Sequence, residues 1–161
     1  MSFNLKKETQ SIENHLISKG FQLKKDNRSG FTARIHVVLD GSGSMKHLYK
    51  NNAVQIALQS VLPLALTVDN DGELPVTLFS NNAYMVDTPV NQDNYADYVK
   101  NNVIPNIEWY GTYYAKPLEL ILKSENFVVE TGMLIYKKTT IQPKPREEST
   151  VIYFFTDGEN M

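Results

Sequence analysis

Residues 35–45 have the sequence IHVVLDGSGSM, in which an apolar run leads directly into a carboxylate and then two hydroxyl side chains at alternating positions. Apart from one histidine, the first five residues carry no polar side chain. This composition is typical of a parallel strand that is buried on both faces in an α/β protein. Because open α/β sheets bind ligands beyond the carboxyl ends of their strands, the segment predicts a ligand-binding loop that begins at Asp40.

A second nearly all-apolar strand is expected over residues 151–156, and it too is followed by aspartate and glycine. Strand and helix patterns alternate between the two. The expected elements are an apolar helix over 54–66, strands over 75–79 and 83–86 joined by a hairpin turn, a helix over 93–103, a loop over 107–112 and a helix that begins near Pro117. We therefore expect an α/β, Rossmann-like fold with a mainly parallel central sheet, flanking helices and one short antiparallel edge strand.

The length of the chain indicates one domain. Its 161 residues, 42% of them hydrophobic, fit a single globular domain over 1–161 with a sizeable core. Residues 1–30 are expected to form an N-terminal helix, over about 4–19, and a loop. Residues 127–149 predict an insertion before the last strand, with an extended segment at 133–136 that suits a hairpin.

The composition excludes several classes of function. With 16 Lys and Arg against 18 Asp and Glu, the net charge of -2 gives no electrostatic reason to expect nucleic acid or an anionic membrane as a partner. The absence of cysteine excludes disulfides, zinc–thiolate sites and thiol catalysis. No run approaches the ~18 apolar residues of a membrane span, and the amino terminus lacks the apolar core of a signal peptide. We therefore expect a cytoplasmic protein.

Oxygen-bearing side chains follow both apolar strands. If the two strands are neighbours in a parallel sheet, Asp40 and Asp157 come within reach of one ion, and Ser42 and Ser44 add neutral oxygens from the first loop. Thr112, in a glycine-containing loop before a helix, can complete the set. All five ligands are hard oxygens, which favour Mg²⁺, Mn²⁺ or Ca²⁺ over zinc or copper. The sequence thus predicts a divalent metal ion, with Mg²⁺ first in order.

These positions resemble the metal-ion-dependent adhesion site of von Willebrand factor A (vWA) domains. The pattern consists of Asp-x-Ser-x-Ser at 40–44, Gly-Thr at 111–112 and Thr-Asp-Gly at 156–158. The resemblance implies that Ser42, Ser44 and Thr112 contact the ion directly, that Asp40 and Asp157 act largely through water, and that one position stays open for a partner's carboxylate. Neutral ligands leave most of the ion's positive charge available to such an outside anion.

Within the family, the sequence is similar to the bacterial tellurium-resistance and stress-response branch over residues 33–161. The similarity includes Leu-Tyr at 48–49, Val-Gln at 54–55, Asp-x-Asp-Gly-x-Leu at 69–74 and Phe79. A domains normally continue for two more strands after the second aspartate, so the resemblance implies that C-terminal strands are missing here. Strand 151–156 would then be an apolar edge through which the chain can self-associate.

Three functions remain open at this stage. The first is a non-enzymatic module in which the ion bridges to an Asp or Glu of a partner protein. The second is a Mg²⁺-dependent phosphohydrolase with Asp40 as nucleophile, although Ser42 stands where such phosphatases place a second aspartate. The third is a scaffold domain with a vestigial site. The sequence has neither a Gly-x-Ser-x-Gly elbow around Ser42 nor a P-loop, and we expect no enzyme.

Aromatic side chains surround the expected threonine ligand. Tyr110, Tyr113 and Tyr114 lie within two residues of Thr112, and Trp109 precedes them. Packing accounts for such residues, but aromatic rims also favour contacts with other proteins.

Overall fold

The computed structural model describes residues 33–69, 72–125, 128–131, 138–141 and 149–158. Its main sheet has four strands in the order β3-β2-β1-β6. β1 (Ala33–Asp40) lies between β2 (Val76–Phe79) and β6 (Ser149–Phe155) and runs parallel to both, while β3 (Ala83–Met85) pairs with β2 in antiparallel fashion. The expected α/β fold, with a mainly parallel sheet and one short antiparallel edge strand, is confirmed.

The two apolar strands are direct neighbours and end level with each other. In the register of the sheet, Leu39 of β1 lies beside Phe155 of β6. The loop that begins at Asp40 and the segment that follows β6 therefore emerge at the same edge of the sheet, which is where a parallel sheet presents its ligand site.

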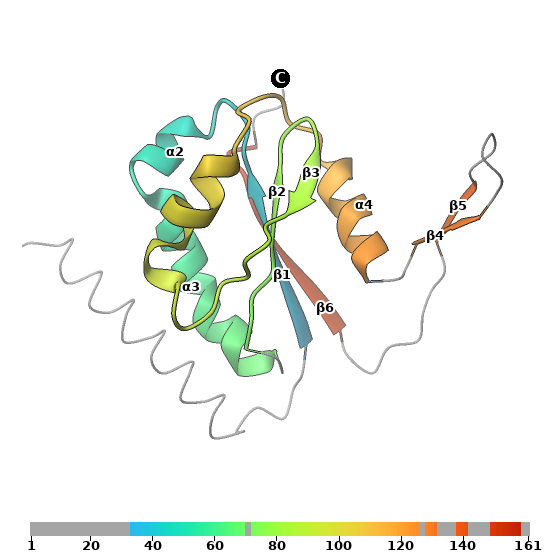
Figure 1. Ribbon diagram of the computed structural model, residues 1–161, viewed down its shortest axis with the longest axis horizontal. Helices are drawn as coiled ribbons and strands as arrows, with labels where there is room; N and C mark the ends of the chain where they lie inside the picture. Colours follow the sequence, from blue (N-terminus) through green and yellow to red (C-terminus); the bar gives the residue numbers. More distant parts are fainter. Residues whose placement is uncertain (1–32, 70–71, 126–127, 132–137, 142–148, 159–161) are drawn as a thin grey trace, which may run out of the picture.

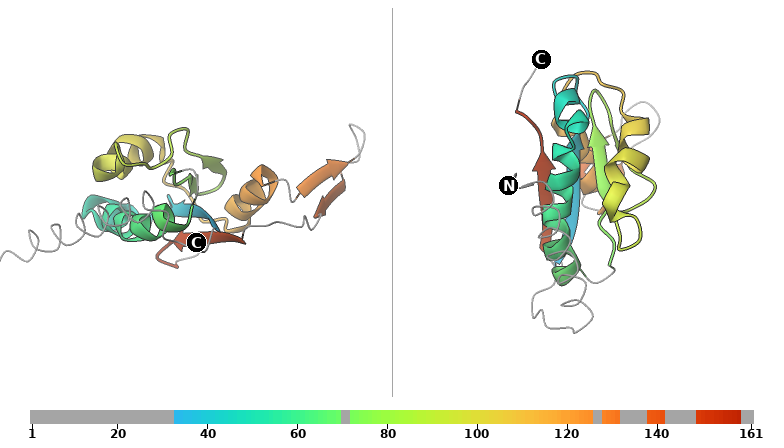
Figure 2. Two further views of the ribbon diagram at one scale, coloured as in Figure 1. Left: turned by 90° about the horizontal axis from the view of Figure 1, so that it is seen from below. Right: turned by 90° about the vertical axis from the view of Figure 1, so that its left-hand side faces the viewer.

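Helices cover both faces of the sheet (Figure 1 and Figure 2). α2 (Lys46–Lys50) and α3 (Ala53–Val68) lie on one face, and α4 (Ala115–Ser124) lies on the other. Val37 and Leu39 of β1 belong to the core cluster that includes α3, whereas Val38 packs with Phe79 and with Ile121 of α4. Burial on both faces explains why β1 is apolar at successive positions rather than at alternate ones.

The helix expected over 93–103 is present as an irregular helical segment of three short pieces rather than as one α-helix. They are η1 (Tyr95–Asp97), the π-helical η2 (Val99–Val103) and η3 (Ile104–Asn106). The side chain of Gln55 on α3 donates to the Tyr95 carbonyl over 2.8 Å and accepts from the Val99 amide over 2.9 Å. These two backbone groups would pair with each other in an α-helix, so the inserted amide breaks the helix at this point.

The insertion before β6 contains an antiparallel pair of strands. β4 (Val128–Thr131) pairs with β5 (Lys138–Ile141) in a separate two-stranded sheet, which lies beyond α4 in Figure 1. The extended segment expected at 133–136 and the helix expected within 1–30 lie outside the described residues.

β6 forms one edge of the main sheet in the part of the chain that the structure describes, and its Ile152 is 36% exposed. Over the same residues, no helix has the length and apolar character needed to cross a membrane.

Candidate metal centre

Asp40 is the most deeply buried of the predicted site residues, together with Ser42; both are 0% exposed. One oxygen of Asp40, Oδ1, accepts a hydrogen bond from the Ser42 amide over 2.8 Å. The other, Oδ2, accepts from the hydroxyl of Thr156 over 2.7 Å. Because protein donors already occupy both oxygens, the geometry suits a carboxylate that orients the loop and acts on an ion through its neighbours.

The hydroxyls of the two serines in the loop lie next to each other. Their Oγ atoms lie 3.0 Å apart. Adjacent corners of an octahedron with Mg²⁺–oxygen bonds of 2.0–2.1 Å are separated by about 2.9 Å. The two hydroxyls are hydrogen-bonded to each other at this distance, and the same spacing matches two neighbouring ligand positions around Mg²⁺.

The third predicted ligand comes from the loop between η3 and α4. Its hydroxyl oxygen, Thr112 Oγ1, is buried and has no hydrogen-bond partner among the described residues. An unsatisfied hydroxyl in a protein interior costs about 1–3 kcal/mol. A bound ion would supply the missing partner, so Thr112 also fits a metal site.

Backbone hydrogen bonds join this loop to the rest of the site. The Gly43 amide donates to the Tyr110 carbonyl over 3.1 Å, and the Tyr113 amide donates to the Ser80 carbonyl over 3.0 Å. The loop that carries Thr112 is thereby attached both to the serine loop and to the end of β2. Among the described residues, the Thr112 side chain makes no hydrogen bond to either serine.

Asp157 lies at the expected edge of the sheet, directly after β6, and is half-buried. Its neighbour Thr156 makes the direct contact to Asp40. The Thr156 hydroxyl is also hydrogen-bonded to the Tyr114 hydroxyl, at 3.2 Å, and accepts from the Gly158 amide over 3.0 Å. Thr156 was expected only as part of the Thr-Asp-Gly pattern, with no role of its own. The signal for its role is a hydroxyl at the carboxyl end of a buried strand.

Two aromatic residues support the serine loop; the packing expected for Trp109 is observed, whereas the role of Tyr49 was not expected. Tyr49 donates a hydrogen bond to the Asp40 carbonyl over 2.8 Å, and the Trp109 ring packs edge-on against it, with 5.4 Å between ring centroids. Burial, with a further contribution from the charge of Asp40, raises the pKa of Tyr49 well above its ordinary value. Tyr49 thus stays protonated and holds the backbone of Asp40 in place.

Within the described residues, no group of three or more His, Cys, Asp or Glu side chains is arranged to hold a metal ion. At the end of β1 and β6, serine and threonine hydroxyls would have to supply most of the ligands, the division that the family resemblance implies. Such a ligand set suits a hard cation.

The fold and a family comparison together define the class of protein. Residues 32–161 match a family of vWA domains, and the chain is a vWA domain by both criteria. More particularly, it belongs to the vWA-TerF-like family, described as the vWA domain found in the TerF C terminus. The tellurium-resistance branch expected from the sequence is thereby confirmed.

A curated relative covers part of the chain. The uncharacterized protein YcbR of Bacillus subtilis (strain 168) is 34% identical over 84 residues, which are 52% of this chain and 34% of YcbR. The chain therefore matches about a third of the length of that relative. No solved structure matches the chain.

Proposed function

We propose that this domain is a metal-dependent protein-binding module of the cytoplasm. A divalent cation, Mg²⁺ first among the candidates, is held by the hydroxyls of Ser42, Ser44 and Thr112, with Asp40 and Asp157 beside it. The ion bridges to an Asp or Glu carboxylate of a partner protein.

The observation that carries the proposal is the buried, unpartnered hydroxyl of Thr112. A buried hydroxyl without a protein partner can be satisfied by a bound water or ion. The Thr77 hydroxyl is also unpartnered but lies on β2 inside the sheet, whereas Thr112 lies in a loop that is hydrogen-bonded to the serine loop. The 3.0 Å spacing of the serine hydroxyls supports the same conclusion from a second loop. Three neutral ligands would leave the ion strongly electrophilic, which favours an incoming carboxylate.

The phosphohydrolase alternative receives no support from the geometry around Asp40. A nucleophilic carboxylate needs an oxygen that can reach a substrate. Asp40 is 0% exposed, and both of its oxygens accept hydrogen bonds from protein donors. We therefore propose a binding module rather than an enzyme.

The biological setting is proposed from the family. Because the chain is a TerF-type vWA domain, we propose that its partner belongs to the bacterial tellurite or stress response. The family match concerns the domain, and a partner held through the ion can be recognised because its binding depends on the ion.

Calorimetric titration tests the ion site directly. Mg²⁺, Mn²⁺ and Ca²⁺ should each be titrated into the wild type and into Thr112→Val, which removes one ligand and keeps the side-chain shape. Thr77→Val is the matched control, since its hydroxyl is also buried without a partner but lies on β2 inside the sheet. We expect binding to the wild type and the control, and at least tenfold weaker binding to Thr112→Val.

A pull-down with and without chelator tests the bridging role. A partner held through the ion should be lost when the chelator is added and in the Thr112→Val variant. If the wild type binds none of the three ions, the domain is a scaffold with a vestigial site and the proposal fails.

A further inference from the structure

We propose that Tyr110 and Tyr113 form an aromatic rim around the ion site, and that this rim selects a partner segment whose acidic residue is flanked by aromatic or other large apolar side chains. The inference rests on the proposed function, because the ion would hold the partner's carboxylate beside the rim. Beyond the proposed function, it specifies which kinds of side chain flank the partner's acidic residue.

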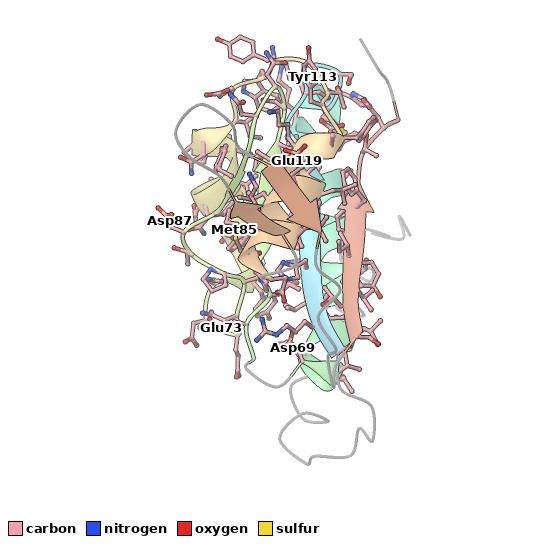
Figure 3. The ribbon with its side chains drawn as sticks, turned by 90° about the vertical axis from the view of Figure 1, so that its right-hand side faces the viewer. Asp69, Glu73, Met85, Asp87, Tyr113 and Glu119 are labelled. Atoms are coloured by element: carbon pink, nitrogen blue, oxygen red, sulfur yellow. The ribbon has the colours of Figure 1, made fainter. Side chains whose placement is uncertain are left out.

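The two tyrosines are the most exposed of the large hydrophobic side chains in the described part of the chain. Tyr113 is 60% exposed and Tyr110 is 58% exposed, whereas the other such residues range from 36% to 50%. Both flank Thr112 in its loop. Figure 3 shows Tyr113 at the end of the molecule where β6 ends, far from Asp69 at the other end. Tyrosines are enriched in the energetically important centres of protein interfaces.

The backbone of the rim is fixed before any partner arrives. The Tyr110 carbonyl accepts from Gly43, and the Tyr113 amide donates to Ser80. Between them, the Gly111 amide donates to Asn81 Oδ1 over 3.0 Å, and a Cβ at position 111 would lie only 2.8 Å from that oxygen. Because the loop is already ordered, a partner loses little binding energy to ordering it.

Trp109 is the last half-buried residue before the exposed Tyr110 in the loop that carries Thr112. Its ring packs against Tyr49, yet its backbone has φ of 57°, in the left-handed region. This conformation costs a bulky residue about 1–2 kcal/mol, and such strained positions recur at functional sites. The inward packing of Trp109 and the exposure of Tyr110 directly after it show that the aromatic residues of this loop are divided between core and surface.

Positive charge borders the rim. Lys46 is exposed and places its ammonium 5.6 Å from the centre of the Trp109 ring, in the residue before Tyr110. Together with a bound cation, this charge favours a partner segment of negative charge. The tyrosines require that the same segment also offer apolar surface.

The test uses three capped pentapeptides as probes. The first has aspartate between two phenylalanines, the second has aspartate between two serines, and the third has asparagine between two phenylalanines. Binding of each, labelled with a fluorophore, is measured by anisotropy in Mg²⁺ and in EDTA. We expect the first peptide to bind about tenfold more tightly than the second in Mg²⁺, and we expect the third peptide, and all three in EDTA, to bind weakly or not at all.

Substitutions then separate the rim from the ion. The double variant Tyr110→Ser/Tyr113→Ser should bind the first peptide no better than the second, while its Mg²⁺ affinity by calorimetry stays within about twofold of wild type. Leu64→Ser is the control, because Leu64 is 50% exposed but lies on α3. It should leave the preference between peptides unchanged. Urea unfolding of each variant verifies that it is folded.

The outcomes distinguish the two proposals. If the wild type binds Mg²⁺ but both aspartate peptides bind equally, or if the double variant keeps the preference, the rim is refuted and the ion site stands. If the phenylalanine peptides bind equally well in EDTA, the tyrosines act without the ion and the inference is overturned. If the wild type binds no Mg²⁺, the proposed function itself fails.

Discussion

Replacement of Thr156 by valine should destabilise the ion-free protein by about 2 kcal/mol. The Thr156 hydroxyl donates to Asp40 Oδ2 over 2.7 Å, and Asp40 is fully buried. Valine keeps the shape of threonine but has no donor, so a buried carboxylate oxygen loses its partner. A hydrogen bond to a charged group contributes about 1.5–3 kcal/mol. Because Thr156 itself is exposed, water can reach its side of the contact, and the loss should fall in the lower half of that range.

The assay is urea unfolding in EDTA, followed by the fluorescence of Trp109, the one tryptophan in the sequence. With a denaturant slope of about 2 kcal/mol per molar, the midpoint should fall by about 1 M urea. Thr77→Val is the matched control, since the Thr77 hydroxyl is buried but has no hydrogen-bond partner. Its removal should leave the protein as stable as before, or stabilise it by about 1 kcal/mol.

Two results would refute this reasoning. One is a Thr156→Val protein whose unfolding free energy stays within about 0.5 kcal/mol of wild type, the range of an ordinary surface substitution. The other is a Thr77→Val protein that loses as much stability as Thr156→Val. The first result would show that the Thr156 hydroxyl is not a significant donor to Asp40. The second would show that removing a threonine hydroxyl destabilises the protein whether or not that hydroxyl has a partner.

Two further predictions concern the rest of the fold. Glu125 is 4% exposed and lies 2.9 Å from His36 Nε2 and 3.2 Å from the Arg34 guanidinium. Glu125→Leu should lower the unfolding free energy by about 2–3 kcal/mol. Arg34→Ala, at a side chain that is 56% exposed, should lower it by less than about 1 kcal/mol. Equal losses in urea unfolding would contradict this account. Burial raises the pKa of Tyr98 above its ordinary value of 10.0. The folded state therefore holds that proton more tightly, and the resulting stability is present below pH 10 and lost above it. Tyr98→Phe should show a shallower alkaline loss of stability than wild type; an unchanged slope would argue against it.

The two apolar strands could be predicted because their sequence signal was strong and local. β1 and β6 are apolar at successive positions, and each leads to an aspartate and a glycine. That pattern has few alternatives in a chain where strands and helices alternate. The predicted metal site required these two strands to be neighbours in the sheet. Their register confirms that they are.

The missed features depend on contacts between distant residues. Gln55 breaks the helix expected over 93–103 from a position about forty residues earlier, and a sequence pattern of helical period contains no sign of that contact. In the same way, the role of Thr156 appears only when β6 lies beside β1 and brings its hydroxyl to Asp40. Tertiary contacts override local preference in both cases.

The positions of the five predicted site residues follow from the topology. Their burial and their hydrogen-bond partners do not. The burial of the Thr112 hydroxyl without a partner results from the way its loop is attached to Gly43 and Ser80. No spacing of residues in the sequence predicts that a buried hydroxyl lacks a partner. The unpartnered Thr112 hydroxyl is nevertheless the feature that tests the ion site most directly.

The decisive measurement is the unfolding free energy of the wild type and of Thr112→Val, each with and without Mg²⁺. An ion present at about 100 times its dissociation constant should stabilise the wild type by about 2.7 kcal/mol. Without the ion, Thr112→Val should be at least as stable as the wild type, because the threonine hydroxyl has no partner to lose. With the ion, the variant should gain little or nothing. If Mg²⁺ stabilises both proteins equally, or neither, Thr112 does not hold an ion and the account is contradicted.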